Sequence, residues 1–173
     1  SYTADKGLEV QDEFYDVYGT REELHRITCT ADVGFANLGK MLYLVKTRLP
    51  EVWVRCKHAL FYDSYFGYEL TGHMGLEHTY LGNHTYLWNF AGKDWSSVGR
   101  DLRADQLFPK NAARSWELLG LVKPEIVQAC GLSENCKVTY GIHDSNANYL
   151  PYIALGYDNF LLNSSGTWCV LMT

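Results

Sequence analysis

Two short polar segments near the end of the chain hold the residues best suited to chemistry. Residues 141–145, Gly-Ile-His-Asp-Ser, follow an apolar run that predicts a strand over residues 137–142 and leaves Asp144 at its tip. A carboxylate placed there could accept a proton from a substrate hydroxyl. Residues 163–167, Asn-Ser-Ser-Gly-Thr, predict a turn whose backbone N–H groups could face an anion. Together the two segments indicate phosphoryl transfer.

Each segment also has a purely structural interpretation. Asp is a favoured helix N-cap, so Asp144 could cap the helix expected over residues 145–155. The turn from Ser164 to Thr167 could simply join two antiparallel strands. A strand, a helix and a second strand commonly form a crossover unit whose strand ends lie on one edge of a sheet, or else a short hairpin that lands nearby, so we expect the turn to lie near Asp144. The residues alone leave both interpretations open.

The two motifs, in this order, resemble the FGGY family of carbohydrate kinases, and most closely its rhamnulokinase-like members. Three further segments match in the same order: residues 35–44 (FANLGKMLYL), residues 65–72 (YFGYELTG) and residues 87–95, which end in Asp-Trp. Two positions depart from the family pattern. Asn37 stands where a small hydroxyl residue or Pro is usual, and Tyr43 stands where Trp is usual.

The resemblance implies an α/β fold of the ribonuclease H-like (actin-like ATPase) class, present as an incomplete domain. Residues 1–173 would form part of the N-terminal, sugar-binding lobe of a two-lobe kinase. The Asp-x-Gly-Thr phosphate turn of the family and its adenine-binding lobe have no counterpart in the sequence. We therefore expect the 173-residue segment alone to be inactive.

The resemblance also implies roles for individual residues. Asp144 corresponds to the general base that deprotonates the sugar hydroxyl, and His143 to a residue that contacts the sugar, with Ser145 flanking the base on its other side. Gly166 and Thr167 correspond to residues that contact the phosphates of ATP, which the family uses with Mg²⁺. The expected reaction is phosphorylation of a ketose or polyol hydroxyl.

Two residues at the start of the helix expected over residues 36–48 are further sugar-binding candidates. Phe35 offers an aromatic ring and Asn37 an amide. The structural alternative is that they form a hydrophobic staple and an N-cap. No metal-binding residues are assigned, because the spacing of the clustered candidates does not suit one helix face; these candidates are His73, Glu77, His78 and His84.

Composition excludes several classes of function. The net charge of −5 and the lack of a Lys/Arg-rich run argue against nucleic acid as a partner. No apolar stretch reaches the roughly 18 residues that would indicate a membrane span. Five cysteines without a Cys-x-x-Cys pair indicate reduced thiols and a cytoplasmic location. The expected partner is a small-molecule sugar, and a homodimer is left open.

Periodicity and breaker residues predict the elements that position these candidates. Helices are expected to end at Gly19, Gly72 and Gly131, and a capping box at residues 20–23 to open the second helix. The remaining expectations are a strand over residues 58–61, an irregular or short-stranded stretch over 73–93, a helical stretch over 95–107, a linker over 108–122 and strands over 159–163 and 168–172.

Two rivals to a kinase remain. A sugar or phosphate-ester hydrolase could use Asp144 with water, but it would want a second carboxylate or a metal cluster. A catalytically silent sugar-binding or regulatory relative would keep the fold and lose the phosphate contacts. The joint presence of Asp144 with Gly166 and Thr167 favours the kinase. No Walker-type Gly-x-x-x-x-Gly-Lys-Ser/Thr loop occurs in the chain.

Overall fold

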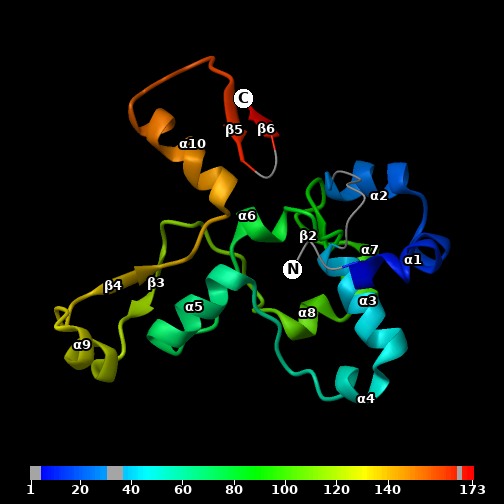
Figure 1. Ribbon diagram of the computed structural model, residues 1–173, viewed down its shortest axis with the longest axis horizontal. Helices are drawn as coiled ribbons and strands as arrows, with labels where there is room; N and C mark the ends of the chain where they lie inside the picture. Colours follow the sequence, from blue (N-terminus) through cyan, green and yellow to red (C-terminus); the bar gives the residue numbers. More distant parts are fainter. Residues whose placement is uncertain (1–4, 31–36, 167–168) are drawn as a thin grey trace.

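The computed structural model describes residues 5–30, 37–166 and 169–173 (Figure 1). Helices dominate the first two thirds of the chain, and short strands lie among them and after them. In chain order the elements are η1 (Asp5–Leu8), α1 (Gln11–Tyr18), α2 (Arg21–Thr28), α3 (Leu38–Arg48), α4 (Pro50–Trp53), α5 (Tyr62–Thr71), α6 (His78–Leu81), β1 (Trp88–Asn89), β2 (Asp94–Trp95), α7 (Ser97–Asp101), α8 (Ala104–Leu107), β3 (Leu118–Leu121), α9 (Pro124–Cys130), β4 (Lys137–Thr139), α10 (Asp144–Ala154), β5 (Leu162–Ser165) and β6 (Cys169–Met172).

Several helix boundaries follow from local sequence signals and were predicted correctly. The Thr20 hydroxyl accepts a hydrogen bond from the Glu23 backbone N–H, and the Glu23 carboxylate accepts one from the Thr20 backbone, which completes the capping box of α2. Gly72 and Gly131 end α5 and α9 with φ of 80° and 65°. Glycine suits both positions because it adopts left-handed conformations without a Cβ clash.

The strands form three two-stranded antiparallel sheets within the described residues: β1 with β2, β3 with β4, and β5 with β6. β4 and β5, which flank α10, therefore pair with different partners. The expected crossover within one sheet is not the observed arrangement. The alternative weighed from the residues, a turn between antiparallel strands, is confirmed, because Ser165 pairs with Cys169 across the β5–β6 hairpin.

Three sequence predictions of elements were wrong. Residues 58–61 form no strand. The helical character expected over residues 95–107 is, by contrast, confirmed as two short helices separated at Arg103, whose φ is 57°. β4 ends at Thr139 rather than at residue 142, and its partner β3 lies inside the stretch expected to be a linker. Strand pairing depends on a distant partner, which local patterns do not report.

The hydrophobic core is built from the helical part of the chain. Phe14 stacks on Tyr86 at a centroid distance of 5.8 Å, and Phe61 stacks on Phe108 at 5.1 Å. Fully burying one such side chain stabilises the fold by about 1.5–3 kcal/mol. The core cluster runs from Val10 to Phe108. Its members are Val10, Phe14, Leu24, Tyr43, Leu44, Trp53, Phe61, Leu76, Leu81, Tyr86, Leu87, Trp95, Val98, Leu102, Ala104, Leu107 and Phe108.

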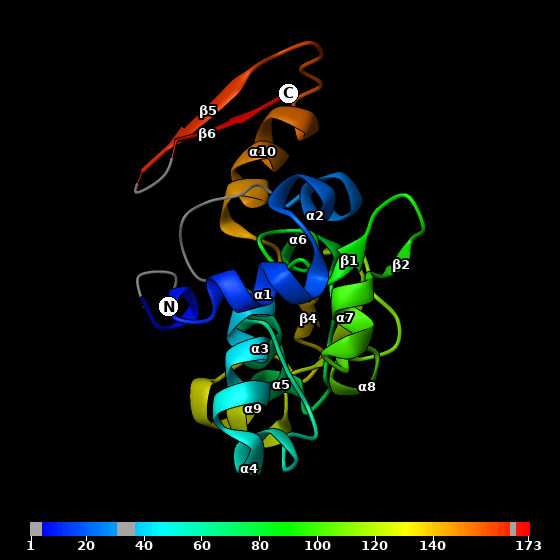
Figure 2. The ribbon, with the colours of Figure 1, turned by 90° about the vertical axis from the view of Figure 1, so that its right-hand side faces the viewer.

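The C-terminal elements lie at the edge of this body. No described residue after Val122 is buried. In both ribbon views α10 and the β5–β6 hairpin project from one end of the molecule (Figures 1 and 2). All five cysteines are free. Of the described helices, none has the length and apolar character that crossing a membrane requires.

Candidate functional site

Asp144 is the first residue of α10, and its side chain is 88% exposed. His143 precedes it as the N-cap residue in extended conformation. The expectation that Asp144 itself might cap the helix is therefore wrong: its Oδ1 accepts a bond from the adjacent Ser145 backbone N–H at 2.6 Å, not from a later turn. A carboxylate with this exposure, at the start of a helix, is accessible to a substrate.

His143 is held from both its backbone and its ring. Its backbone N–H donates to Oγ1 of Thr79 at 2.8 Å, and its Nε2 lies 2.6 Å from Nδ2 of Asn83. The Tyr80 ring meets the imidazole edge-on at 5.1 Å. All three contacts come from α6 or the residues just after it. The position of Asp144 is thus set by a segment about 60 residues earlier in the chain.

Glu77, the N-cap residue of α6, supports this arrangement. It is fully buried, and its carboxylate caps α6 by accepting bonds from the backbone N–H groups of Thr79 and Tyr80. It also accepts from the Thr79 hydroxyl at 2.7 Å and from the Ser115 hydroxyl at 3.3 Å. A buried carboxylate is costly unless it is hydrogen-bonded, and here four donors satisfy it. Glu77 is therefore structural, and not the metal ligand that its neighbourhood of histidines might suggest.

The start of α3 lies next to the same segment. Asn37 is buried, and its Oδ1 accepts from the Lys40 backbone N–H at 3.0 Å, so the N-cap interpretation of Asn37 is confirmed. The Leu38 and Gly39 N–H groups donate to the carbonyls of His84 and Thr85 at 3.3 and 3.0 Å. Phe35 lies outside the described residues. The sugar-binding roles of Phe35 and Asn37 remain predictions.

Glycine is required at one point of this junction. A Cβ built on Gly39 would stand 2.6 Å from the Thr85 carbonyl oxygen. The absence of a side chain lets α3 approach the residues after α6 closely enough for their backbones to bond. Residues 83–85 are consequently fixed between two helix starts, that of α3 on one side and that of α10 on the other.

The residues after α6 also have strained backbone. His84 and Tyr86 have φ of 53° and 60°, in the left-handed region that side chains with a Cβ rarely adopt. Tyr86 is 1% exposed and is clamped in the core by its stack on Phe14. Such strain persists only where the surroundings over-determine it, and it is concentrated at functional sites. It is an independent indication that this segment has a role beyond connecting two elements.

The expected phosphate turn lies beside α10. Nδ2 of Asn148 donates to Oγ of Ser164 at 3.0 Å. Asn148 is one helical turn from Asp144, which is about 6 Å along the helix axis. Gly166 is exposed, a Cβ built on it would meet nothing within 4 Å, and its φ is not positive. Its backbone is therefore open to an approaching anion. Thr167 lies outside the described residues.

Several ionisable side chains of the group have shifted pKa values. Burial lowers the pKa of His143. The charges of Asp144 and Glu77 act in the opposite direction, but burial is the larger effect. Burial raises the pKa of Asp63 to about 6, and the Glu77 charge adds to that rise. The pKa of Tyr80 is also raised, by burial and then by the neighbouring carboxylates. Perturbed pKa values gathered at one place indicate a candidate functional site.

Asp63 reaches this group because Gly141 has no side chain. A Cβ on Gly141 would collide with the Asp63 carboxylate, so the start of α5 packs directly on the loop that leads to Asp144. Oδ2 of Asp63 is buried and has no hydrogen-bond partner among the described residues. Sequence reasoning missed Asp63, Thr79 and Asn83. Only the polar run Asn83-His84-Thr85 inside an otherwise aromatic stretch signalled that this region differs.

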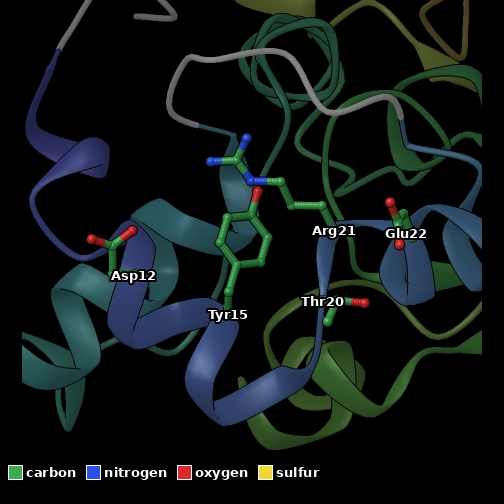
Figure 3. Close-up of a pocket in the computed structure, with 5 residues that line it drawn as sticks. All are labelled: Asp12, Tyr15, Thr20, Arg21 and Glu22. Carbon is green, nitrogen blue, oxygen red and sulfur yellow. The ribbon is translucent and has the colours of Figure 1, made fainter.

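No metal-binding cluster marks the group in the part of the chain that the structure describes. Within residues 5–30, 37–166 and 169–173, no set of three or more His, Cys, Asp or Glu side chains could hold a metal ion. A pocket on α1 and α2 lies elsewhere and contains none of the predicted site residues (Figure 3). Asp12, Tyr15, Thr20, Arg21 and Glu22 line it. Asp144 itself presents an exposed carboxylate, a group that is chemically able to accept a proton.

No protein-family model and no curated protein matches the chain, but solved structures do. A carbohydrate kinase from Novosphingobium aromaticivorans is similar over 95% of this chain and 35% of its own, with a TM-score of 0.78 and 28% identity. Ligand-bound xylulose kinase from Lactobacillus acidophilus is similar over 90% of this chain and 31% of its own, at a TM-score of 0.75 and 18% identity. Plasmodium falciparum glycerol kinase with ADP is similar over 82% of this chain and 28% of its own, at a TM-score of 0.64 and 19% identity.

These neighbours are carbohydrate kinases, and the chain spans 28–35% of their length. The predicted fold class is confirmed: the chain has the α/β fold of the ribonuclease H-like (actin-like ATPase) class, over part of the length at which these kinases have it. The similarity to the Novosphingobium protein extends along almost the whole chain.

Proposed function

We propose that this chain is part of an ATP-dependent carbohydrate kinase of the FGGY type, with rhamnulokinase-like character, that phosphorylates a hydroxyl of a ketose or polyol. The observation that carries the proposal is the likeness to a carbohydrate kinase over 95% of the chain. The exposed carboxylate of Asp144 at the start of α10 supplies the group that such a reaction needs. The chain would correspond to part of the sugar-binding lobe.

Asp144 acts as the general base in this proposal. Its carboxylate accepts the proton of the sugar hydroxyl while that oxygen forms a bond to the γ-phosphorus and the bond from phosphorus to the departing ADP breaks. The proton then passes from Asp144 to solvent, which its exposure allows. ATP would supply the phosphoryl group, and Mg²⁺ bound together with ATP would neutralise the charge that develops on the phosphates.

The remaining residues of the chain bind and orient. The backbone N–H of Gly166, and that of Thr167, would face the phosphates from the β5–β6 turn. Ser145, which is half-buried beside Asp144, and the adjacent His143 are placed to border the sugar. Phe35 and Asn37 at the start of α3 would complete the sugar side. The reduced thiols are consistent with a cytoplasmic setting, and we place the reaction there.

A substrate screen of the full-length protein tests this function. ATP consumption would be measured with a panel of ketoses, aldoses and polyols, in the presence of Mg²⁺. Turnover with at least one ketose or polyol is the expected result. Sugar binding by calorimetry without any turnover would instead identify a catalytically silent relative. The 173-residue segment alone should show no sugar-dependent ADP release, because positioning ATP and sugar together requires more of the cleft.

A further inference from the structure

The contact between Asn83 and His143 places an amide against one nitrogen of an imidazole whose other nitrogen faces the proposed base. Nδ2 of Asn83 lies 2.6 Å from Nε2 of His143. Nδ1 of the same ring lies 3.2 Å from Oδ1 of Asp144. The second pair is close but lacks the alignment of a full hydrogen bond, so its interaction is chiefly electrostatic. The three residues form a chain from a well-anchored segment to an exposed carboxylate.

The protonation state of the ring follows from these neighbours. Burial favours the neutral imidazole, which carries one proton on either Nδ1 or Nε2. If the Asn83 amide donates to Nε2, the proton is on Nδ1 and faces the negative carboxylate of Asp144. If the amide were turned so that its oxygen accepted from Nε2–H, the bare Nδ1 lone pair would face that carboxylate. Electrostatics favours the first arrangement.

Asn83 is itself held rigidly. It directly precedes His84, whose carbonyl accepts from the Leu38 N–H, and whose backbone is in the left-handed region. Thr79, on the other side, fixes the His143 backbone through a separate hydrogen bond. The ring and the backbone of His143 therefore have different anchors. Losing the Asn83 contact would free the ring to rotate while the loop kept its place.

We propose that Asn83 is a positioning residue: by donating to Nε2 it holds His143 as the Nδ1–H tautomer and directs that N–H toward the Asp144 carboxylate. The functional part of this inference rests on the proposed role of Asp144 as the general base. The Nδ1–H, 3.2 Å from Oδ1 of Asp144, limits the orientations of the Asp144 side chain. Four ionisable side chains face the imidazole: those of Asp144, Glu77, His84 and Tyr80.

The test combines imidazole NMR with kinetics on the full-length protein. The ¹⁵N shifts of His143, assigned by their loss in His143→Gln, should show a protonated Nδ1 and a bare Nε2 at pH 7. Asn83→Leu should move the ring toward a mixture of tautomers and lower kcat by about 10-fold, while the sugar KM stays within about 3-fold. Asn83→Asp, of nearly the same size, should raise the His143 pKa, because a carboxylate would then face Nε2. Asn111→Leu, at an exposed asparagine 28 positions after Asn83, is the matched control. It should leave the ¹⁵N shifts and the pKa of His143, and kcat, unchanged.

The outcomes separate this inference from the proposed function. Unchanged ¹⁵N shifts in Asn83→Leu and an unchanged His143 pKa in Asn83→Asp would overturn the positioning role. Should Asn83→Leu fail to fold, the pKa of His143 in Asn83→Asp decides alone. Altered shifts in a protein that phosphorylates no sugar would confirm the Asn83 to His143 coupling and reject the kinase. Altered shifts with unchanged kcat would show that the coupling has no part in catalysis, and would likewise overturn the proposal.

Discussion

The Thr79 hydroxyl accepts a hydrogen bond from the His143 backbone N–H at 2.8 Å, across 64 positions of the chain. The same hydroxyl donates its proton to the buried carboxylate of Glu77 at 2.7 Å. The loop that delivers Asp144 is thereby tied to the cap of α6, and through that cap to the protein core. The side chain of Asp144 is exposed, but the backbone at the preceding residue, His143, is held by this hydrogen bond.

Replacing Asp144 with Asn should lower kcat by at least about 100-fold in the full-length enzyme, with the sugar affinity changed only a few-fold. The amide keeps the shape of the side chain and loses the ability to accept the proton. Steady-state kinetics and sugar calorimetry measure the two quantities. Asp158→Asn, at another exposed aspartate, is the control and should leave both unchanged. Equal losses of binding and turnover in Asp144→Asn would instead point to a structural role.

Gly166→Val should raise the apparent KM for ATP by about 10-fold, equivalent to about 1.4 kcal/mol, and affect the KM for sugar far less. A β-branched side chain would obstruct an anion that approaches the backbone there. The fold has room for the new side chain, because a Cβ at Gly166 meets nothing within 4 Å. The melting temperature should therefore stay at the wild-type value. A sugar KM that rises as much as the ATP KM would argue against a phosphate turn.

Gly39→Ala should lower the free energy of unfolding by about 1–3 kcal/mol, because the added methyl group would stand 2.6 Å from the Thr85 carbonyl oxygen. Denaturant titration of the full-length protein measures this change. Gly166→Ala is the matched control, since the same methyl group enters open space there. An equally small loss of unfolding free energy in both variants would contradict the close contact between α3 and residues 83–85.

Asn37→Ala should cost about 1 kcal/mol of stability, because α3 loses its N-cap. Asn37→Ser keeps a capping oxygen and should retain most of that stability. A raised sugar KM in Asn37→Ser would then report the loss of an amide contact to the sugar, separately from capping. Thr20→Ala removes the cap of α2 and should reduce stability without altering the sugar KM. An unchanged sugar KM in Asn37→Ser would show that Asn37 acts only as the N-cap of α3 and does not contact the sugar.

Asp63 should make stability depend on pH between about 4 and 6. Its pKa is raised in the folded state to about 6, chiefly by burial, from an ordinary value of 3.8. A raised folded pKa means that the folded state binds the proton more tightly, so the contribution is present below pH 4 and is lost as the pH rises through 6. A shift of this size corresponds to about 3 kcal/mol, which partial exposure of the side chain reduces to on the order of 1 kcal/mol.

Asp63→Asn should therefore raise stability at pH 7 and leave it nearly unchanged at pH 4, since an amide carries no charge to bury. Thermal melting at the two pH values is the measurement. Asp105→Asn, at an exposed aspartate, serves as the control. A variant that is less stable than the wild type at pH 7 would mean that the Asp63 carboxylate has a favourable partner in the folded protein.

The parts of the fold that could be predicted are those encoded over a few residues. The capping box at Thr20 and the terminal glycines of α5 and α9 act within one turn of backbone, so their signals survive in the sequence alone. β3 was missed because its four residues become a strand only through pairing with β4. The resemblance of ordered motifs led to Asp144 and Gly166. It did not lead to Asn83, whose importance comes from a contact across 60 positions.

The confinement of the buried residues to the part of the chain before Val122 separates two kinds of mutational risk. Substitutions in α1 to α8 act on the tightly packed interior, and their effects should appear as altered abundance of the protein. Substitutions in α10 and the β5–β6 hairpin act on side chains that lie outside this interior, so they should disturb its packing little. A saturation-mutagenesis map scored for abundance should therefore show the losses that come from disrupted packing of this interior at residues up to Val122.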